Sequence, residues 1–162
     1  MKKLVIFYSF EGNTKFVAET IAKAVDADIL ELKPEKEMKT HSFFKYIIGG
    51  AQVVFKYKPK LKPFNINPQD YNLIFIGTPA WALDYTPTMH SFLSSTKIND
   101  KQIALFCSRM SNGGKSLKTM KKKLVGNEFI GELDLSQPLL KEKEKNLIKI
   151  QKWSKEMVRI SK

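Results

Sequence analysis

The first 25 residues constrain the fold more than any other stretch of this chain. Residues 4–8 form an unbroken run of apolar, strand-forming side chains, the pattern of a strand that is buried on both faces of a parallel sheet. The run stops at a short polar segment, 9–14, which contains hydroxyl, amide and glycine residues. Apolar side chains then recur on one helical face over residues 15–25. The stretch therefore predicts a strand, a tight loop and a helix start in immediate succession.

The predicted loop 9–14 has the chemistry of an anion site. A tight loop before a helix gathers backbone N–H groups and the positive end of the helix dipole at one point. Ser9, Asn13 and Thr14 offer further donors, and no lysine or arginine lies between Ser9 and Thr14. We therefore expect a phosphate group held by uncharged donors. The alternative is a simple turn in which Asn13 or Thr14 caps the helix.

The same alternation of apolar runs and amphipathic segments continues along the chain. Further strands are predicted at 27–32, 71–77, 102–107 and 128–135, and further helices at 88–95, 115–124 and 141–160. This order predicts an α/β fold, a doubly wound five-stranded parallel sheet with helices on both faces. No repeat or change of composition divides the chain, so we expect a single domain over residues 1–162.

Two segments lie outside this simple alternation. Residues 41–57 are apolar and aromatic, with Gly49 and Gly50 in their middle, and each glycine weakens a helix by roughly 1 kcal/mol relative to alanine. They form either a helix that covers one sheet face or an aromatic flap or self-association surface. Residues 58–70 contain three prolines and are expected to form an extended connection.

Composition favours a cytoplasmic globular protein. Hydrophobic residues make up 43% of the chain, which argues against global disorder. The single cysteine, Cys107, excludes an internal disulfide framework and fits a reducing cytosol. No apolar run approaches the roughly 18 residues that cross a bilayer, and the N-terminal run has no cleavage-like site.

The charge is strongly positive. Lysine and arginine number 28 against 16 acidic residues, a net charge of +12. This charge permits weak binding to nucleic acid, anionic membranes or acidic proteins. Most of it is lysine without a nucleic-acid recognition motif, so we expect no specific nucleic-acid partner. General solubility and a dedicated acidic partner both remain open explanations.

Three loops are expected to meet at one edge of the predicted sheet. In doubly wound sheets, ligands bind beyond the carboxyl ends of the strands. Loops 9–14, 78–86 and 107–114 follow strands that should be central, and each is unusually polar, aromatic or rich in glycine. The sequence therefore predicts one binding site built from these loops.

The three loops resemble the cofactor loops of flavodoxins. Residues 8–14 are similar to the phosphate loop of that family, 77–81 to its second loop, and 107–114 to its third, and the resemblance runs essentially the whole length of the chain. It implies a flavodoxin-like fold with strand order 2-1-3-4-5 and the cofactor flavin mononucleotide (FMN). The cofactor-binding residues that it implies are Ser9, Phe10, Glu11, Gly12, Asn13, Thr14, Thr78, Pro79, Ala80, Trp81, Tyr85, Cys107, Ser108, Gly113 and Gly114.

The resemblance also implies a role for each loop. Loop 9–14 holds the phosphate, Thr78 hydrogen-bonds the ribityl chain or the ring edge, and Trp81 stacks on the flavin ring. Gly113 and Gly114 let the backbone approach the ring without a Cβ atom in the way. No residue is assigned a catalytic or metal-binding role.

Several of these residues have a second interpretation. Trp81 could instead pack on neighbouring prolines, and Tyr85 either contacts the flavin or only braces its own loop. Cys107 is either a small apolar residue, the usual behaviour of a buried cysteine, or a reactive thiol. Arg109 binds an anion of a substrate or partner, or is solvated.

The resemblance leaves three functions open. The first is an FMN-binding flavodoxin-type electron-transfer protein, whose redox partners its charge suggests are acidic. The second is an FMN-dependent reductase with NAD(P)H as donor and a quinone or other small acceptor. Better-known flavodoxins are acidic, and their third loop often supplies an aromatic side chain that 107–114 lacks, which leaves room for a substrate. The third is a cofactor-free binding module for an acidic partner.

Overall fold

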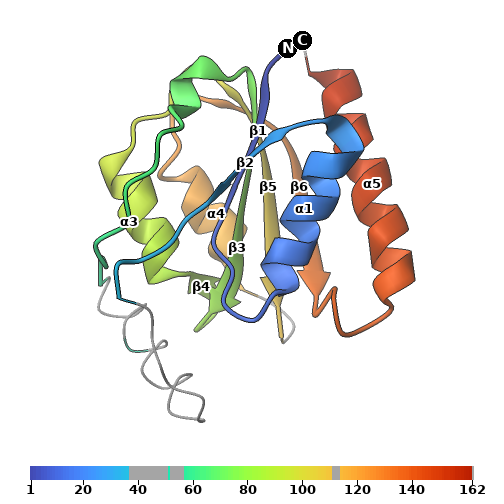
Figure 1. The fold of residues 1–162 in the computed structure, drawn as a ribbon, viewed down its shortest axis with the longest axis horizontal. Coiled ribbons are helices and arrows are strands. Elements are labelled where there is room, and N and C mark those ends of the chain that lie inside the picture. The colour runs from blue at the N-terminus through green and yellow to red at the C-terminus, as the bar shows by residue number, and fades with distance from the viewer. Residues whose placement is uncertain (37–50, 52–56, 111–113, 162) are drawn as a thin grey trace.

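The architecture is a twisted, mainly parallel sheet between two layers of helices (Figure 1). The structure, a computed structural model, describes residues 1–36, 51, 57–110 and 114–161. Five strands pair in parallel in the order β2-β1-β3-β5-β6, and the short strand β4 pairs antiparallel with β3. This confirms the predicted flavodoxin-like fold and the order of its parallel strands, since β5 and β6 are the predicted fourth and fifth strands.

The elements follow the predicted alternation. In chain order they are β1 (Lys3–Phe7), α1 (Asn13–Val25), β2 (Asp28–Glu31), the 3₁₀ turn η1 (Pro68–Asp70), β3 (Leu73–Trp81), β4 (Asp84–Tyr85), α3 (Pro87–Ser95), β5 (Gln102–Arg109), α4 (Ser116–Lys121), β6 (Glu128–Ser136) and α5 (Lys143–Ile160).

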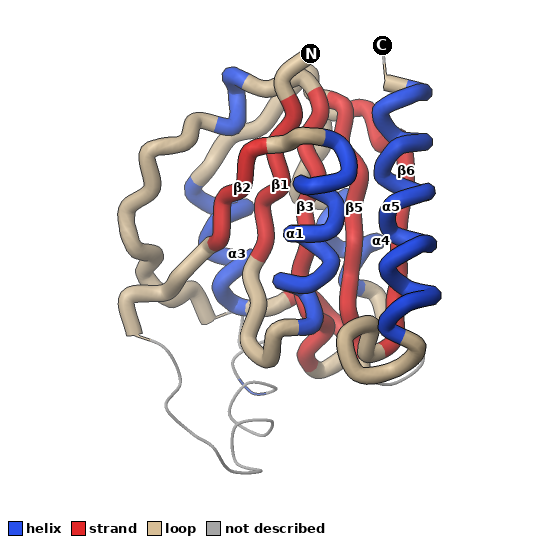
Figure 2. Tube along the Cα trace, turned by 45° about the vertical axis from the view of Figure 1, so that its right-hand side comes forward, coloured by secondary structure: helices blue, strands red, loops and turns tan. Residues whose placement is uncertain are grey.

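Alternate side chains of the central strands build two separate cores. Leu4 and Ile6 of β1 face one cluster with side chains of α3 and α4, whereas Val5 and Phe7 face a second cluster with side chains of α1 and α5. These four β1 residues are at most 1% exposed, because helices cover both faces of the sheet. Figure 2 shows α1 and α5 together in front of the sheet.

Several predicted boundaries need correction. The third strand runs on to Trp81, so part of the predicted loop 78–86 is a strand and a β-hairpin. Helix α4 is shorter than predicted and ends at Lys121, because the amides of Lys123 and Leu124 bond to carbonyls three residues back and so form turns in place of a last helical turn. The predicted connection 58–70 contains a bridge between Pro34 and Leu61 as well as η1. The segment 41–57 lies outside the described residues except for Ala51 and Tyr57.

Candidate functional site

The first loop of the site, residues 8–12, runs from β1 to the N-terminus of α1. Gly12 is the N-cap residue, with a φ of 88° that an L-residue with a side chain rarely adopts. The hydroxyl of Ser9 accepts a hydrogen bond from the amide of Lys15 at 3.1 Å, so one amide of the first helical turn is satisfied within the loop. These two residues shape the loop around the start of the helix.

The remaining first-turn amides suit an anion. Gly12 gives the helix no side-chain cap, and the first turn of α1 holds no acidic residue. The amides of Asn13 and Thr14 have no acceptor within the helix, because the first N–H groups of any α-helix lack one. These donors and the helix dipole point to the same place. The local structure therefore fits the predicted phosphate site.

A loop that the sequence analysis did not include also contacts this site. The amide of Leu139, in the loop after β6, donates to the side-chain oxygen of Asn13 at 3.1 Å. The two loops touch closely, since a Cβ atom at Gly12 would lie 3.5 Å from Leu139 Cδ2. The signal was present in the sequence, because this loop follows the carboxyl end of a parallel strand like the other three.

A buried hydroxyl pair joins the first loop to the third. The Oγ1 atom of Thr14 and the Oγ atom of Ser108 are 2.6 Å apart, and the two residues are 1% and 3% exposed. Ser108 lies at the end of β5, so this hydrogen bond fixes α1 against the carboxyl edge of the sheet. Thr14 and Ser108 come together as predicted, but their hydroxyls are partners of each other.

An aromatic group connects the first loop to the second. The ring of Trp81 lies edge-on to the rings of Phe10 and Tyr8, with centroids 5.5 and 6.1 Å apart. Trp81 is partly exposed at the end of β3. Such contacts hold the rings in defined orientations, so Phe10 and Trp81 form a fixed aromatic wall beside the loop.

The second and third loops meet at the tip of the β3–β4 hairpin. Ala82 and Leu83 both have positive φ, at 47° and 64°, although neither is a glycine. The carbonyl of Leu83 accepts a hydrogen bond from the amide of Lys115 at 2.7 Å. Gly114 has a φ of +133°, and a Cβ atom there would lie 3.3 Å from the same carbonyl oxygen. Glycine is therefore required where the backbones meet.

Two residues predicted to contact the ligand have partners within the protein. The Thr78 side chain is fully buried, and its hydroxyl lies 3.1 Å from the hydroxyl of Thr86, the N-cap of α3. Tyr85 is 6% exposed and its ring packs at 5.9 Å against His90. Burial and the nearby Asp84 raise the pKa of Tyr85 to about 12. Both residues brace the hairpin in this conformation.

The remaining predicted residues divide by exposure. Pro79 and Ala80 are partly exposed in β3, Glu11 is exposed in the first loop, and Gly113 lies outside the described residues. Cys107 is buried, and burial together with Asp134 raises the pKa of its thiol to about 12. A protonated thiol is a poor nucleophile, which supports the apolar interpretation of Cys107.

Arg109 is paired within the protein. Its Nε atom donates to both carboxylate oxygens of Asp134, each at 2.8 Å. This arrangement does not support a role for Arg109 in binding an anion.

Within the described ranges no group of three or more histidine, cysteine or acidic side chains could hold a metal ion, and no helix there is long and apolar enough to cross a membrane.

The fold and these loops define an α/β protein with a candidate ligand site at the carboxyl edge of its sheet. A family model described as flavodoxin matches residues 2–156. The chain therefore belongs to the flavodoxin family. No curated protein matches the sequence.

Solved structures from bacteria and archaea are similar to this chain. A flavoprotein from Lactobacillus acidophilus, in complex with FMN, is 25% identical over 82% of this chain and 92% of its own, with a TM-score of 0.71. A flavoprotein candidate from Bacteroides uniformis is 21% identical over 95% and 97%, with a TM-score of 0.79. A flavodoxin from the domain Archaea is 15% identical over 98% and 97%, with a TM-score of 0.68.

Proposed function

We propose that this chain binds FMN and passes electrons between redox partners. The observation that carries the proposal is the joining of the three predicted loops at one edge of the sheet. The Thr14–Ser108 hydroxyl pair and the Lys115–Leu83 hydrogen bond connect them. A ligand with an anion at one end and a flat, semi-apolar ring at the other fits a site that combines these features.

The residues present fit the two ends of FMN. The Asn13 and Thr14 amides and the dipole of α1 suit the phosphate, and the aromatic wall of Phe10 and Trp81 suits the flavin ring. The bound flavin supplies the redox chemistry, and the protein binds it, orients it and sets its electrostatic surroundings. The relative from Lactobacillus acidophilus, crystallised with FMN, supports this assignment.

An electron-transfer role is supported over a reductase by the polar groups near the site. The Nε atom of Arg109 is bonded to Asp134 and the Cys107 thiol is buried, so neither observation supports a substrate contact by these two residues. The net charge of +12 favours encounter with acidic redox partners, because a field of one sign steers oppositely charged proteins. These partners are proteins of acidic surface rather than a small acceptor.

Stepwise reduction of the FMN-loaded protein tests this function. We expect two resolved one-electron steps and only slow oxidation of added NAD(P)H in the presence of a quinone. Rapid NAD(P)H oxidation with quinone turnover would instead favour the FMN-dependent reductase. Failure of the protein to take up FMN would reject both functions and leave the cofactor-free binding module.

A further inference from the structure

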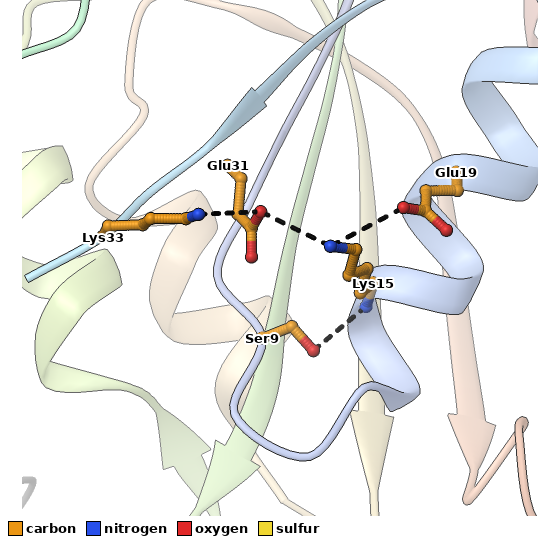
Figure 3. Close-up of polar contacts among 5 residues, drawn as sticks. All are labelled: Ser9, Lys15, Glu19, Glu31 and Lys33. Atoms are coloured by element: carbon orange, nitrogen blue, oxygen red, sulfur yellow. Dashed lines mark hydrogen bonds and ion pairs between the residues drawn. The ribbon is translucent and has the colours of Figure 1, made fainter. Parts of the chain in front are cut away.

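Lys15 is the first positively charged residue after loop 9–14, which we call the anion loop, and it lies in a row of alternating charges. The Lys15 ammonium lies 3.8 Å from a carboxylate oxygen of Glu19, one helical turn further on, and 3.8 Å from Glu31 of β2. Glu31 also lies 3.6 Å from the ammonium of Lys33. Figure 3 shows the row Glu19–Lys15–Glu31–Lys33 running from α1 to the end of β2.

The position of Lys15 makes this arrangement unexpected. It is the third residue of α1, where the helix dipole disfavours a positive charge. Side chains in a helix lean toward its N-terminus, so an unrestrained lysine at this position leans toward the loop. Instead, its ammonium points away from the bend of the loop, while its amide donates to Ser9 inside it (Figure 3).

We propose that Glu31, together with Glu19, is a positioning residue that holds the Lys15 ammonium outside the anion loop. The inference rests on the proposed binding of FMN phosphate at this loop. Its consequence is that uncharged donors alone contact the phosphate, although a lysine stands next to them. Glu31 is the more restricted of the two acids, with 27% of its side chain exposed against 56% for Glu19.

If Glu19 and Glu31 position Lys15, the variants should differ in FMN affinity from what a simple change of electrostatic field predicts. Remote charges acting through their fields change FMN affinity additively, whereas groups in contact are coupled. If the two carboxylates restrain Lys15, removing its charge matters little while they are present. Once they are neutral, the ammonium reaches the phosphate, and removing it then has a clear effect.

The experiment is a mutant cycle read out as the ratio of the dissociation constants for riboflavin and FMN. This ratio isolates the phosphate, because riboflavin lacks it. The double variant Glu19→Gln/Glu31→Gln is expected to bind FMN about two- to fivefold more tightly, the size of a partly exposed charge contact. Lys15→Gln should remove that gain in the double variant and change the ratio less in the wild-type background. Riboflavin affinity should stay constant throughout.

Lys143→Gln is the matched control. It removes one positive charge beside the first turn of α1, where the Lys143 ammonium lies 5.8 Å from the centre of the Phe16 ring, and it lies outside the row of Glu19, Lys15, Glu31 and Lys33. Its effect on the ratio should be equal in both backgrounds. An equal effect of Lys15→Gln in both backgrounds, or a larger one in the wild type, would overturn the positioning role while leaving FMN binding intact. A wild-type protein that binds no FMN would overturn this role and the proposed function together.

Discussion

At the scale of the residue, the polar groups of the site are mostly engaged with one another. The Thr14 and Ser108 hydroxyls form one buried pair and the Thr78 and Thr86 hydroxyls form another. Sequence reasoning identified three of these four residues as site residues from their types and positions. It could not find their partners, because a hydroxyl is compatible with a ligand contact and with a structural hydrogen bond alike.

Trp81 gives a test of the aromatic wall. The Trp81→Ala variant is expected to recover flavin fluorescence that the wild-type complex quenches, because a stacked indole is an effective quencher of a flavin ring. The measurement is the fluorescence of bound FMN at saturating protein. Trp153→Phe is the control, since Trp153 packs on Phe75 in the core with a centroid distance of 5.7 Å. Equal quenching in wild type and Trp81→Ala would place the indole away from the ring.

The Cys107 thiol gives a pH-dependent prediction. Burial raises its pKa from 9.0 to about 12, so the folded protein keeps the proton while the unfolded chain loses it near pH 9. The thiol therefore costs no stability below pH 9, and the folded state loses stability as the pH rises from 9 toward 12. At pH 8 a thiol reagent should label Cys107 in denaturant and barely in the native protein. Fast labelling of Cys107 in the native protein would show that its thiol is accessible to solvent.

At the scale of the element, the sequence predicted the parallel sheet and its helices but not the β3–β4 hairpin. Long apolar runs and amphipathic stripes predicted β1, β3, β5 and α5, because burial on two faces leaves a strong pattern. The β3–β4 hairpin has no such pattern. Its turn places Ala82 and Leu83 at positive φ, where Asn and Gly are the usual signals. Loop contacts, rather than local preference, hold this turn.

Relieving the backbone strain at Ala82 and Leu83 should stabilise the protein. The double variant Ala82→Asn/Leu83→Gly supplies the residues that positive φ favours and removes a leucine that is 55% exposed. We expect about 1 kcal/mol of added stability and a rise in Tm of about 2–4 °C, measured by thermal unfolding.

The control is another exposed leucine near the site. Leu140 is 73% exposed and does not have a positive φ. The Leu140→Gly variant should therefore lose stability, because glycine adds freedom to the unfolded chain. A loss of stability in the hairpin variant as well would mean that the turn is not strained.

At the scale of the whole molecule, positive charge surrounds the site at different distances. Lys115 is the N-cap residue of α4 and Lys118 lies within the helix, whereas Lys122 and Lys123 follow its last residue. Lys121 is already engaged, since it pairs with Glu132 and lies 5.3 Å from the centre of the Phe129 ring. The four other lysines are exposed, and Lys115 among them lies 3.7 Å from a carboxylate oxygen of Asp84. Salt screens exposed charges beyond about 8–10 Å.

Neutralising these lysines tests whether their electrostatic field changes the reduction potential of the flavin. The fully reduced flavin carries more negative charge, so losing nearby positive charge should lower the potential of the second reduction step. Lys115→Gln/Lys118→Gln should lower it more than Lys122→Gln/Lys123→Gln, in each case by less than about 60 mV, which is a tenfold change for one electron. Potentiometric titration at low and high salt should show both shifts shrinking. If neither double variant changes the reduction potential, the lysines act only in solubility or docking.

The central claim is that loop 9–14 binds the phosphate of FMN, and the most direct test compares FMN with riboflavin. Two charge-assisted hydrogen bonds contribute enough for FMN to bind about 100-fold more tightly or better. Gly12→Ala should narrow this preference, because the φ of +88° strains any side chain at the loop. Gly126→Ala, at a φ of +90° away from the site, should keep it. Equal binding of FMN and riboflavin to the wild-type protein would contradict the claim.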